Sequence, residues 1–106
     1  MKTKDRILQA ALRQFNTVGT DQTTVRSVAE EVGISHGNLC YHFKNTDELI
    51  EALYLQLVDE TAEVLGAPYR ATFDLETGWL QSQATFQLLY RYRFLLLDFA
   101  RIIRRI

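Results

Sequence analysis

Residues 24–44 place small polar side chains, aromatic rings and a glycine at the spacing of two short helices. Two short helices are predicted there, joined by residues 31–34, in which Gly33 would end the first helix. The second helix is predicted to begin at Ser35, its N-cap, and to end near Phe43. A helix, a tight glycine turn and a second helix with a polar and aromatic outer face are typical of the helix-turn-helix motif. The chemistry predicted here is therefore recognition of base edges and phosphates in the DNA major groove.

Four of these residues have a specific predicted chemistry. Arg26, near the exposed start of the first helix, has the donors to bind guanine at two points or to clamp a phosphate. The alternative is a solvated surface arginine. Gly37 would let the second helix approach the duplex closely, and Asn38 can pair with adenine or bind a phosphate near the free amides of the helix start. Ser35 and Asn38 can also simply satisfy that helix start, and both roles can hold together.

His36 and Cys40 stand four residues apart on one face of the second helix, with His42 close by. A metal site would need a third or fourth converging ligand, and the sequence offers only distant carboxylates. A cysteine–histidine nucleophile would need a pocket that so small a helical unit lacks. We therefore expect no catalytic residue, no metal, no cofactor and no enzymatic activity.

Composition and charge place the protein among intracellular proteins with a basic front. The chain has 106 residues, 47% of them apolar, and a formal net charge of −1. Residues 1–44 hold six Lys or Arg against four Asp or Glu (+2), and residues 45–106 hold six against nine (−3). The single cysteine excludes an internal disulfide and suits a reducing compartment. No signal peptide or membrane-spanning stretch is predicted, so we expect a cytoplasmic protein without membrane contact.

The front of the chain is predicted to fold as three helices. The first would run from Thr3, as N-cap, to about Thr17 and end at Gly19, and Thr24 would cap the second. One apolar stripe on the first helix would pack against a second stripe at intervals of three and four. The first stripe is Ile7, Leu8, Ala11, Leu12 and Phe15, and the second is Val25, Val28, Ala29 and Val32; Ile34, Leu39 and Phe43 are also predicted to be buried.

Longer helices are predicted after residue 44. Asn45 and Glu48 form a capping box that would open a helix running to about Val64, with Leu49, Ile50, Leu53, Leu57 and Val58 facing inward. Residues 69–74 are predicted to be a connector. The spacing of Leu75, Trp79, Ser82, Phe86 and Leu89 predicts another amphipathic helix, and residues 90–106 would form a further helix that is apolar on nearly all sides.

The last residues carry no glycine, proline or other stop signal, so the final helix is predicted to be cut rather than finished. Ten apolar side chains are predicted to be too many for the first four helices to cover, which implies further chain or a partner. They are Trp79, Phe86, Tyr90, Phe94, Leu95, Leu97, Phe99, Ile102, Ile103 and Ile106.

Over residues 3–60 the chain resembles the TetR family of bacterial transcriptional repressors. The resemblance is carried, in order, by Ile7-Leu8, Ala10-Ala11, Phe15, Gly19, Thr23-Thr24-Val25-Arg26, Val28-Ala29, Val32-Gly33-Ile34-Ser35, Gly37-Asn38-Leu39, Tyr41-His42-Phe43-Lys44 and Asp47-Glu48-Leu49. It implies an all-α homodimer with a three-helix DNA-binding head and a larger C-terminal domain for ligand binding and dimerisation. Residues 1–46 would be the helix-turn-helix domain, and residues 47–106 only the start of the helical regulatory domain.

The resemblance also extends the predicted DNA contacts. Tyr41 and His42 are similar to the family's phosphate-contacting aromatics, although one ring can instead pack against the first helix, and Lys44 is a point charge just beyond. A lower pH would charge His42 and strengthen a phosphate contact. The full predicted set is Thr24, Arg26, Ser35, His36, Gly37, Asn38, Cys40, Tyr41, His42 and Lys44.

Two positions depart from the family pattern. Cys40 stands where a tyrosine is usual, and Thr46 stands where a basic residue is common. Both changes remove a habitual DNA contact, so they bear on operator affinity and sequence preference.

Together these features predict a ligand-responsive repressor that binds a palindromic operator in double-stranded DNA. It would act as a homodimer formed through its C-terminal domain and would release DNA when a small-molecule inducer, of unknown identity, binds. The alternative is a helical protein-interaction module that uses the same head without binding DNA. In that case phosphate contacts, and the steep salt dependence they impose, would be missing.

Overall fold

The computed structural model describes residues 2–66, 75–98, 102 and 104, and these residues form six helices without a strand. The helices are α1 (Thr3–Val18), α2 (Val25–Val32), α3 (His36–His42), α4 (Thr46–Gly66), α5 (Leu75–Arg91) and α6 (Arg93–Leu97). The predicted all-α class is confirmed. Within the described ranges no helix is both long and apolar enough to cross a membrane.

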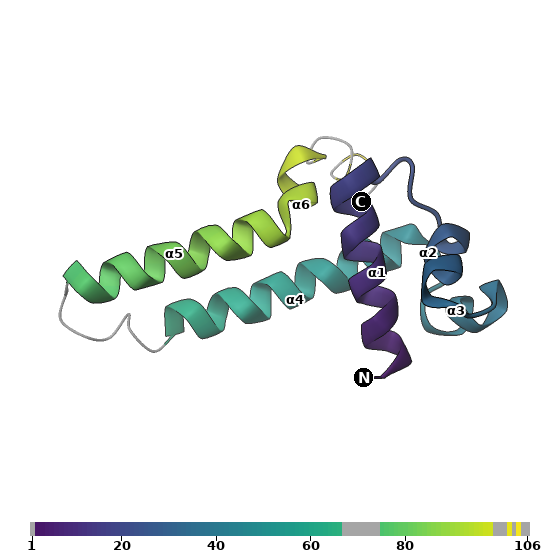
Figure 1. The fold of residues 1–106 in the computed structure, drawn as a ribbon, viewed down its shortest axis with the longest axis horizontal. Helices are drawn as coiled ribbons and strands as arrows, with labels where there is room; N and C mark the ends of the chain where they lie inside the picture. The colour runs from purple at the N-terminus through teal and green to yellow at the C-terminus, as the bar shows by residue number, and fades with distance from the viewer. Residues whose placement is uncertain (1, 67–74, 99–101, 103, 105–106) are drawn as a thin grey trace.

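The molecule is an elongated body of 51 × 32 × 21 Å with a compact head and a two-helix arm. Helix α1 stands at the junction, with α2 and α3 on one side (Figure 1). On the other side α4 and α5 run side by side in opposite directions, and α6 turns back onto the upper end of α1 (Figure 1). The head is therefore held at a fixed place relative to the arm.

The core of the head matches the predicted stripes. Buried side chains come from α1, α2, α3 and the first half of α4, so α4 belongs to the head core as well as to the arm. Val25 and Ile34 are only partly buried, and Val58, predicted to face inward, is 45% exposed. The predicted boundary at residue 46 stays a prediction. The buried core residues are Ile7, Leu8, Ala10, Ala11, Leu12, Phe15, Val28, Ala29, Val32, Leu39, Phe43, Leu49, Ile50 and Leu53.

The predicted helix caps agree with the structure except at two places, the N-cap of α1 and one hydrogen bond at the start of α4. Thr3 is not the N-cap of α1: Lys2 holds that position without a side-chain bond, and Thr3 is already helical. The predicted cap on α4 is present, because Asn45 Oδ1 accepts from the Glu48 amide at 3.0 Å. The Glu48 carboxylate, however, accepts from the amide of Lys44 at 2.7 Å, one residue earlier than in a standard capping box.

The predicted amphipathic helix is present as α5, but its apolar stripe is not the face that packs on α4. Trp79, Ser82, Phe86 and Leu89 are exposed, and the half-buried side chains are those of Gln81, Ala84, Thr85 and Leu88. Gln81 donates to the carbonyl of Val64 on α4 at 3.4 Å. Apolar periodicity identified the stripe, but α4 packs against a different and narrower face. The side chain of Leu75 and the predicted connector 69–74 lie outside the described residues.

The predicted continuous helix over residues 90–106 is wrong, because α5 ends at Arg91 and α6 begins at Arg93. Tyr92 lies between them with φ −106° and ψ 30°. The side-chain amide of Asn16 on α1 donates to the Arg91 carbonyl at 2.8 Å and accepts from the Phe94 amide at 3.0 Å. A tertiary partner thus satisfies both backbone groups at the break. The predicted cut at the chain end falls on residues 99–106, most of which lie outside the described part.

Helix α6 packs onto the head and buries part of the apolar surface predicted to be uncovered. The Phe94 ring stacks on the Phe15 ring with centroids 4.9 Å apart, and Phe94 and Ile102 are buried. The Asp98 carboxylate accepts from the backbone N–H and the hydroxyl of Thr20 at 2.9 and 3.1 Å. These two residues are therefore covered, whereas the prediction was that the ten side chains cannot all be covered.

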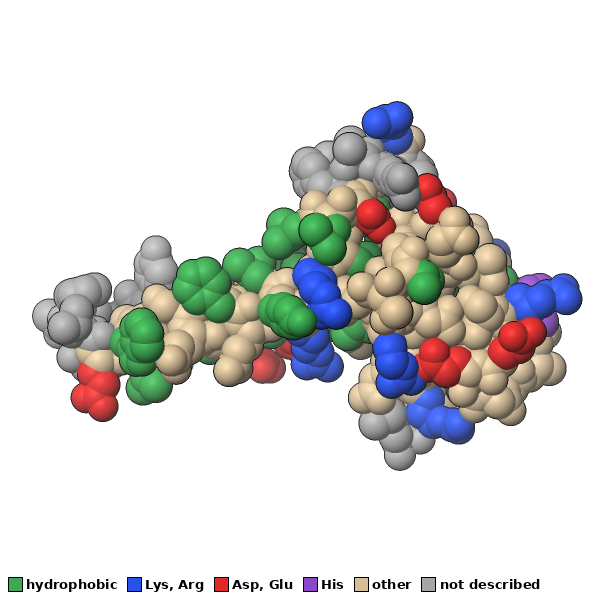
Figure 2. All heavy atoms as spheres, turned by 45° about the horizontal axis from the view of Figure 1, so that its top comes forward, with side chains coloured by type: hydrophobic (Ala, Val, Ile, Leu, Met, Phe, Trp, Pro, Cys, Tyr) green, Lys and Arg blue, Asp and Glu red, His purple; other side chains and the backbone are tan. Residues whose placement is uncertain are grey.

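Other members of that predicted set remain uncovered. Trp79, Phe86, Tyr90 and Leu97 are 62–75% exposed, and Leu95 is half-buried. Apolar side chains lie along the arm in the space-filling view (Figure 2). Phe99, Ile103 and Ile106 lie outside the described residues.

Replacing Phe94 by alanine should destabilise the chain by about 3–5 kcal/mol, because it removes a buried ring and leaves a cavity beside Phe15. Phe86→Ala is the matched control, since that ring is 70% exposed, and it should change the free energy of unfolding by less than about 0.5 kcal/mol. Urea unfolding followed by circular dichroism measures both. Equal effects would mean that α6 does not pack on the head in solution.

Stability at alkaline pH should depend on Tyr92. Burial, and then the negative charge of Glu60, raises the pKa of the Tyr92 hydroxyl above its ordinary value of 10.0. The hydroxyl also donates to Glu60 Oε1 at 3.1 Å. Because the unfolded chain ionises first, this contribution is full below pH 10.0 and is lost as pH rises through the folded pKa.

Tyr92→Phe should cost about 1 kcal/mol near pH 7 and should also flatten the decline in unfolding free energy above pH 10. Tyr54→Phe, on an exposed ring of α4, is the control and should follow the wild type. If both variants show the wild-type decline, the Tyr92 hydroxyl does not report on folding.

Candidate nucleic-acid interface

Side chains of α1 hold α2, and so the helix-turn-helix, in place. Gln14 Nε2 donates to the Ser27 carbonyl and to Glu31 Oε1 at 3.1 and 3.0 Å, and the Ser27 hydroxyl donates to Gln14 Oε1 at 2.6 Å. Arg13 forms an ion pair with Glu31. At the other end of α2, Arg6 donates to the carbonyl of Val32, the last residue of the helix, at 2.8 Å. Both ends of α2 are thus fixed by α1.

The turn between α2 and α3 is a left-handed glycine turn. Gly33 has φ 84° and ψ 30°, a conformation that costs other residues energy, and its amide donates to Ala29. Leu39 and Phe43 then anchor α3 in the core, at 0% and 5% exposure. These contacts leave the opposite face of α3 turned outward, as the motif requires.

Thr24 and Ser35 are confirmed as helix N-caps. The Thr24 hydroxyl accepts from the Ser27 amide at 2.9 Å, and the Ser27 hydroxyl returns a contact to the Thr24 amide at 3.1 Å. The Ser35 hydroxyl accepts from the Asn38 amide at 3.0 Å. Each hydroxyl still has its own O–H donor, so capping and a phosphate contact are compatible.

The tip of α3 is exposed. His36, Gly37 and Asn38 all face solvent, and a Cβ built on Gly37 would meet no atom within 4 Å. Within the described part of the chain, the Asn38 side-chain amide and the Arg26 guanidinium form no hydrogen bond or ion pair. Both groups are therefore available to an outside partner, and Gly37 has a steric role only if another molecule comes close.

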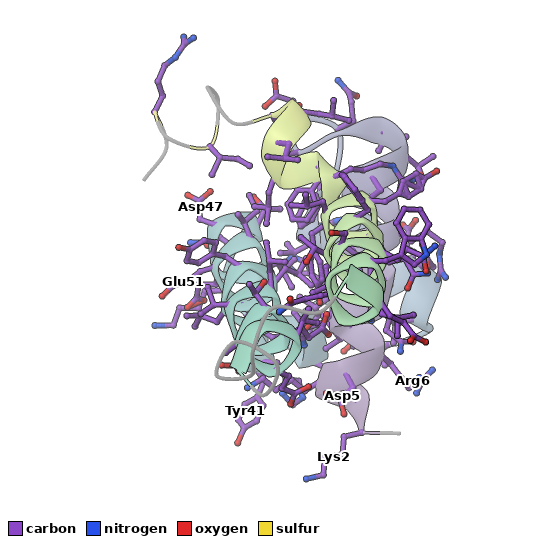
Figure 3. All side chains as sticks on the ribbon, turned by 90° about the vertical axis from the view of Figure 1, so that its left-hand side faces the viewer. Lys2, Asp5, Arg6, Tyr41, Asp47 and Glu51 are labelled. Atoms are coloured by element: carbon purple, nitrogen blue, oxygen red, sulfur yellow. The ribbon has the colours of Figure 1, made fainter. Side chains whose placement is uncertain are left out.

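The aromatic end of α3 also points outward. Tyr41 is 85% exposed and projects from the molecule (Figure 3). The half-buried ring of His42 meets it edge-on, with centroids 5.3 Å apart. Lys44 is exposed just beyond. Of the two predicted phosphate-contacting rings, that of Tyr41 is the more exposed.

Lys4 is a cation near this surface that sequence reasoning missed. Its ammonium lies 5.9 Å from the centroid of the Phe43 ring, next to the end of α3. The residue is forty positions away from Lys44 in the sequence, and no local pattern links the two. The signal that the sequence offered was Phe43, an aromatic residue predicted to be buried that directly precedes the predicted contact Lys44.

His36 and Cys40 face each other as their spacing predicts, with Sγ 3.6 Å from Nε2. Among the described residues no group of three or more His, Cys, Asp or Glu could hold a metal ion. The thiol is partly exposed. The pair can therefore share a weak hydrogen bond on the outer side of α3.

Known proteins resemble this arrangement. The family model described as "Bacterial regulatory proteins, tetR family" matches residues 7–53. The crystal structure of a TetR-family transcriptional regulator from Marinobacter aquaeolei VT8 superposes with a TM-score of 0.93 at 30% identity, covering 100% of this chain and 52% of that one. The chain is therefore similar to TetR-family regulators, in sequence over residues 7–53 and in fold.

Curated relatives match part of the chain. The HTH-type transcriptional repressor KstR2 of Mycolicibacterium smegmatis is 36% identical over 56 residues, which are 53% of this chain and 27% of that protein. The HTH-type transcriptional regulator TtgR of Pseudomonas putida is 38% identical over 64 residues, 60% of this chain and 30% of that protein. The chain thus spans about a third of the length of these relatives or less.

The ten predicted DNA-contacting residues extend from Thr24, the N-cap of α2, to Lys44, which follows the C-cap of α3. Eight of these residues are exposed, including Thr24 at the start of α2. The other two, Cys40 and His42, are partly buried. Their individual roles stay predictions. The two departures from the family pattern stand within and just after this range, at Cys40 in α3 and at Thr46, the first residue of α4.

The Cys40 thiol should react with N-ethylmaleimide, and the adduct should abolish DNA binding because its bulk would stand between α3 and the groove. Helicity by circular dichroism should not change. Incubation with duplex DNA before alkylation should protect the thiol. A Cys40→Ser chain given the same treatment is the control and should keep its affinity; an unreactive wild-type thiol would contradict the placement of this side chain.

Proposed function

We propose that this chain is the DNA-reading head and adjoining regulatory arm of a transcriptional regulator, a repressor that responds to a ligand. The observation that carries the proposal is the α3 tip, where an exposed polar helix start and an unpartnered Arg26 are held on a core fixed by α1. The similarity to TetR-family regulators supports the same reading. Residues 1–46 would form the reading head, and residues 47–106 would belong to the helical regulatory domain.

In this proposal α3 lies in the major groove with its N-terminal tip toward the base edges. Arg26 and Asn38 are the candidates for base contacts, since both have bidentate donor or acceptor geometry for guanine and adenine. Tyr41, His42 and Lys44 would contact phosphates and fix the register. Thr24 and Ser35 would direct free helix-start amides toward the backbone of the duplex.

The proposed regulator works as a homodimer on a palindromic operator. Exposed Trp79, Phe86 and Tyr90 on α5 support an interaction between arms, because an apolar face of this kind marks an interface. A small-molecule inducer bound by the regulatory domain would change the separation of the two α3 helices. Since half-sites are spaced by the helical turn of DNA, a small change breaks simultaneous docking.

The contacts of α6 with the head support this proposal. Helix α6 is tied to the end of α1 by Asn16 and to the loop before α2 by the Asp98–Thr20 bonds. A shift of the arm would therefore reach the start of α2, where Arg26 stands. The relatives are transcriptional regulators, so we propose no catalysed reaction, and we place the protein in the cytoplasm.

Arg26→Ala should weaken binding to a preferred duplex by about 1–3 kcal/mol if the arginine reads a base, and Tyr41→Ala should weaken all duplexes alike. Lys44→Ala should reduce the slope of log affinity against log salt by about 1. Fluorescence anisotropy on selected and random duplexes at several salt concentrations measures all three. Arg104→Ala and Tyr54→Ala are controls on exposed side chains that are not among the predicted contacts.

Wild-type affinity in the Arg26 and Tyr41 variants would remove this surface from the DNA contact. Binding of wild-type protein without a salt slope, or no binding to any duplex, would instead favour the protein-interaction module, which lacks phosphate contacts.

A further inference from the structure

Helix α4 has an outer face that the other described helices leave exposed. Figure 3 shows Glu51 on the side of α4 that points away from α5. Seven residues between positions 51 and 63 are exposed on this helix, and they form what we call the α4 stripe: Glu51, Tyr54, Leu55, Val58, Asp59, Ala62 and Glu63. At the rise of an α-helix the stripe is about 18 Å long, enough to seat several turns of a second helix.

The α4 stripe consists of two adjoining rows with different chemistry. Both follow the four-residue spacing that brings side chains together along one face of a helix. The apolar row is Tyr54, Val58 and Ala62, and the second row is Glu51, Leu55, Asp59 and Glu63. Tyr54 and Leu55 are each 53% exposed and Val58 is 45% exposed, so an apolar surface stands directly beside carboxylates.

The carboxylates of the α4 stripe have no counter-charge within the described part of the chain. Helix α4 contains six Asp or Glu and no Lys, Arg or His. Glu60, outside the stripe, is paired with Arg91 at 3.5 Å. Among the described residues Glu51, Asp59 and Glu63 form no hydrogen bond or ion pair. Their negative charges therefore remain available to a partner.

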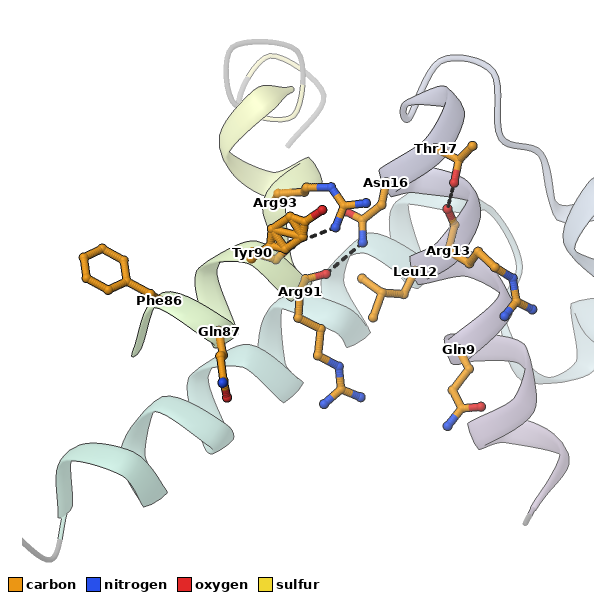
Figure 4. Close-up of a pocket in the computed structure, with 10 residues that line it drawn as sticks. All are labelled: Gln9, Leu12, Arg13, Asn16, Thr17, Phe86, Gln87, Tyr90, Arg91 and Arg93. Carbon is orange, nitrogen blue, oxygen red and sulfur yellow. Dashed lines mark hydrogen bonds between the residues drawn. The ribbon is translucent and has the colours of Figure 1, made fainter. Parts of the chain in front are cut away.

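The basic side chains at the end of α5 lie elsewhere on the arm. Arg91 and Arg93 stand close to α1, where Asn16 bonds the Arg91 carbonyl (Figure 4). The Arg93 guanidinium lies over the Tyr90 ring, 4.4 Å from its centroid. Charge is thus segregated along the arm, and these arginines do not neutralise the α4 stripe.

A basic amphipathic helix fits both rows of the stripe. Its apolar side would pack on Tyr54, Leu55 and Val58, because rows of side chains spaced four residues apart interdigitate between two helices. Lysine or arginine on one flank would face the carboxylates, and such complementary charges attract a partner and fix its orientation. A second copy of α4 docked through the same stripe would instead oppose carboxylate to carboxylate, which costs free energy.

We propose that the α4 stripe is a docking surface for a basic amphipathic helix of a partner protein. The apolar row supplies the buried contact, and the carboxylates on one side of it select a partner with basic residues on the matching flank. This interaction is separate from the proposed DNA contact, which uses α2 and α3 on the head.

Fluorescence anisotropy of a labelled synthetic peptide tests the surface. The peptide is about 14 residues long, with leucine on one face of the helix and lysine on the flank. It should bind the 106-residue chain saturably with a dissociation constant in the micromolar range, and more weakly as salt rises. A matched peptide with glutamate in place of lysine should bind at least about tenfold more weakly.

Two pairs of variants separate the α4 stripe from the rest of the surface. Leu55→Ala should weaken the lysine peptide by about tenfold. Leu80→Ala, on a leucine of α5 that is 59% exposed, should leave the affinity unchanged. Glu51→Gln should weaken the peptide by about threefold and flatten its salt dependence. Glu30→Gln, on an exposed carboxylate of α2, should do neither.

Circular dichroism checks that each variant is folded, and Val58→Ala replaces Leu55→Ala if that variant is not. Equal losses in the variants at positions 55 and 80, or equal affinity for the lysine and glutamate peptides, would overturn the proposal. Sedimentation tests a second copy as the occupant: a wild-type dimer that Leu55→Ala converts to a monomer would overturn it as well. The titration contains no DNA, so its outcome is independent of the proposed DNA-binding function.

Discussion

The ring of Phe15 lies where the two parts of the molecule meet. It is 1% exposed, it belongs to the buried cluster that includes Val28 and Leu49, and it stacks on Phe94 from α6 at 4.9 Å. Burial of such a ring contributes several kcal/mol, a large share of the stability of a small domain. Because one side chain serves both the head core and the arm, neither part can shift on α1 without disturbing the packing of the other.

Polar contacts around this ring determine what each part can do. Asn16 and Thr20 fasten α6 on one side of α1, while Arg6 and Gln14 fasten the two ends of α2 on the other. These hydrogen bonds join α1 and the residues that follow it to α2 and α6. None of them involves the polar tip of α3. A rigid support with an unoccupied outer face is what a reader of double-stranded DNA needs, since accurate placement reduces the entropy lost on binding.

The sequence predicted the head well because its signals are local. Caps such as Thr24, Ser35 and Asn45 depend on neighbouring residues, and the stripes of α1 and α2 have a period that only one packing satisfies. Arg26 and Asn38 were placed from their positions at helix starts, and the outward position of Tyr41 was implied by the family resemblance. Thr3 failed as a cap because helix starts are fixed to within only a residue or two by local sequence.

The arm was predicted less well because its structure depends on distant partners. The stripe of α5 that contains Phe86 is the most apolar, yet α4 packs against the face of Gln81, and periodicity alone cannot tell which face finds a partner. The break at Tyr92 has no glycine or proline to announce it. It is stabilised by Asn16, which lies on α1 and far away in the sequence, so it could not be found by reading along the chain.

The long sequence separation of the α1–α6 contacts has a consequence for the order of folding. Asn16 and Phe94 are 78 positions apart, as are Thr20 and Asp98, whereas the core of the head is complete once the first half of α4 is present. Contacts between distant positions form slowly, since a long loop must close first. On the ribosome, where N-terminal segments emerge first, the head would form with the side of Phe15 that faces α6 still in water. The nascent chain would therefore expose an apolar surface at the end of α1. This surface would be buried only after residue 94 has been synthesised.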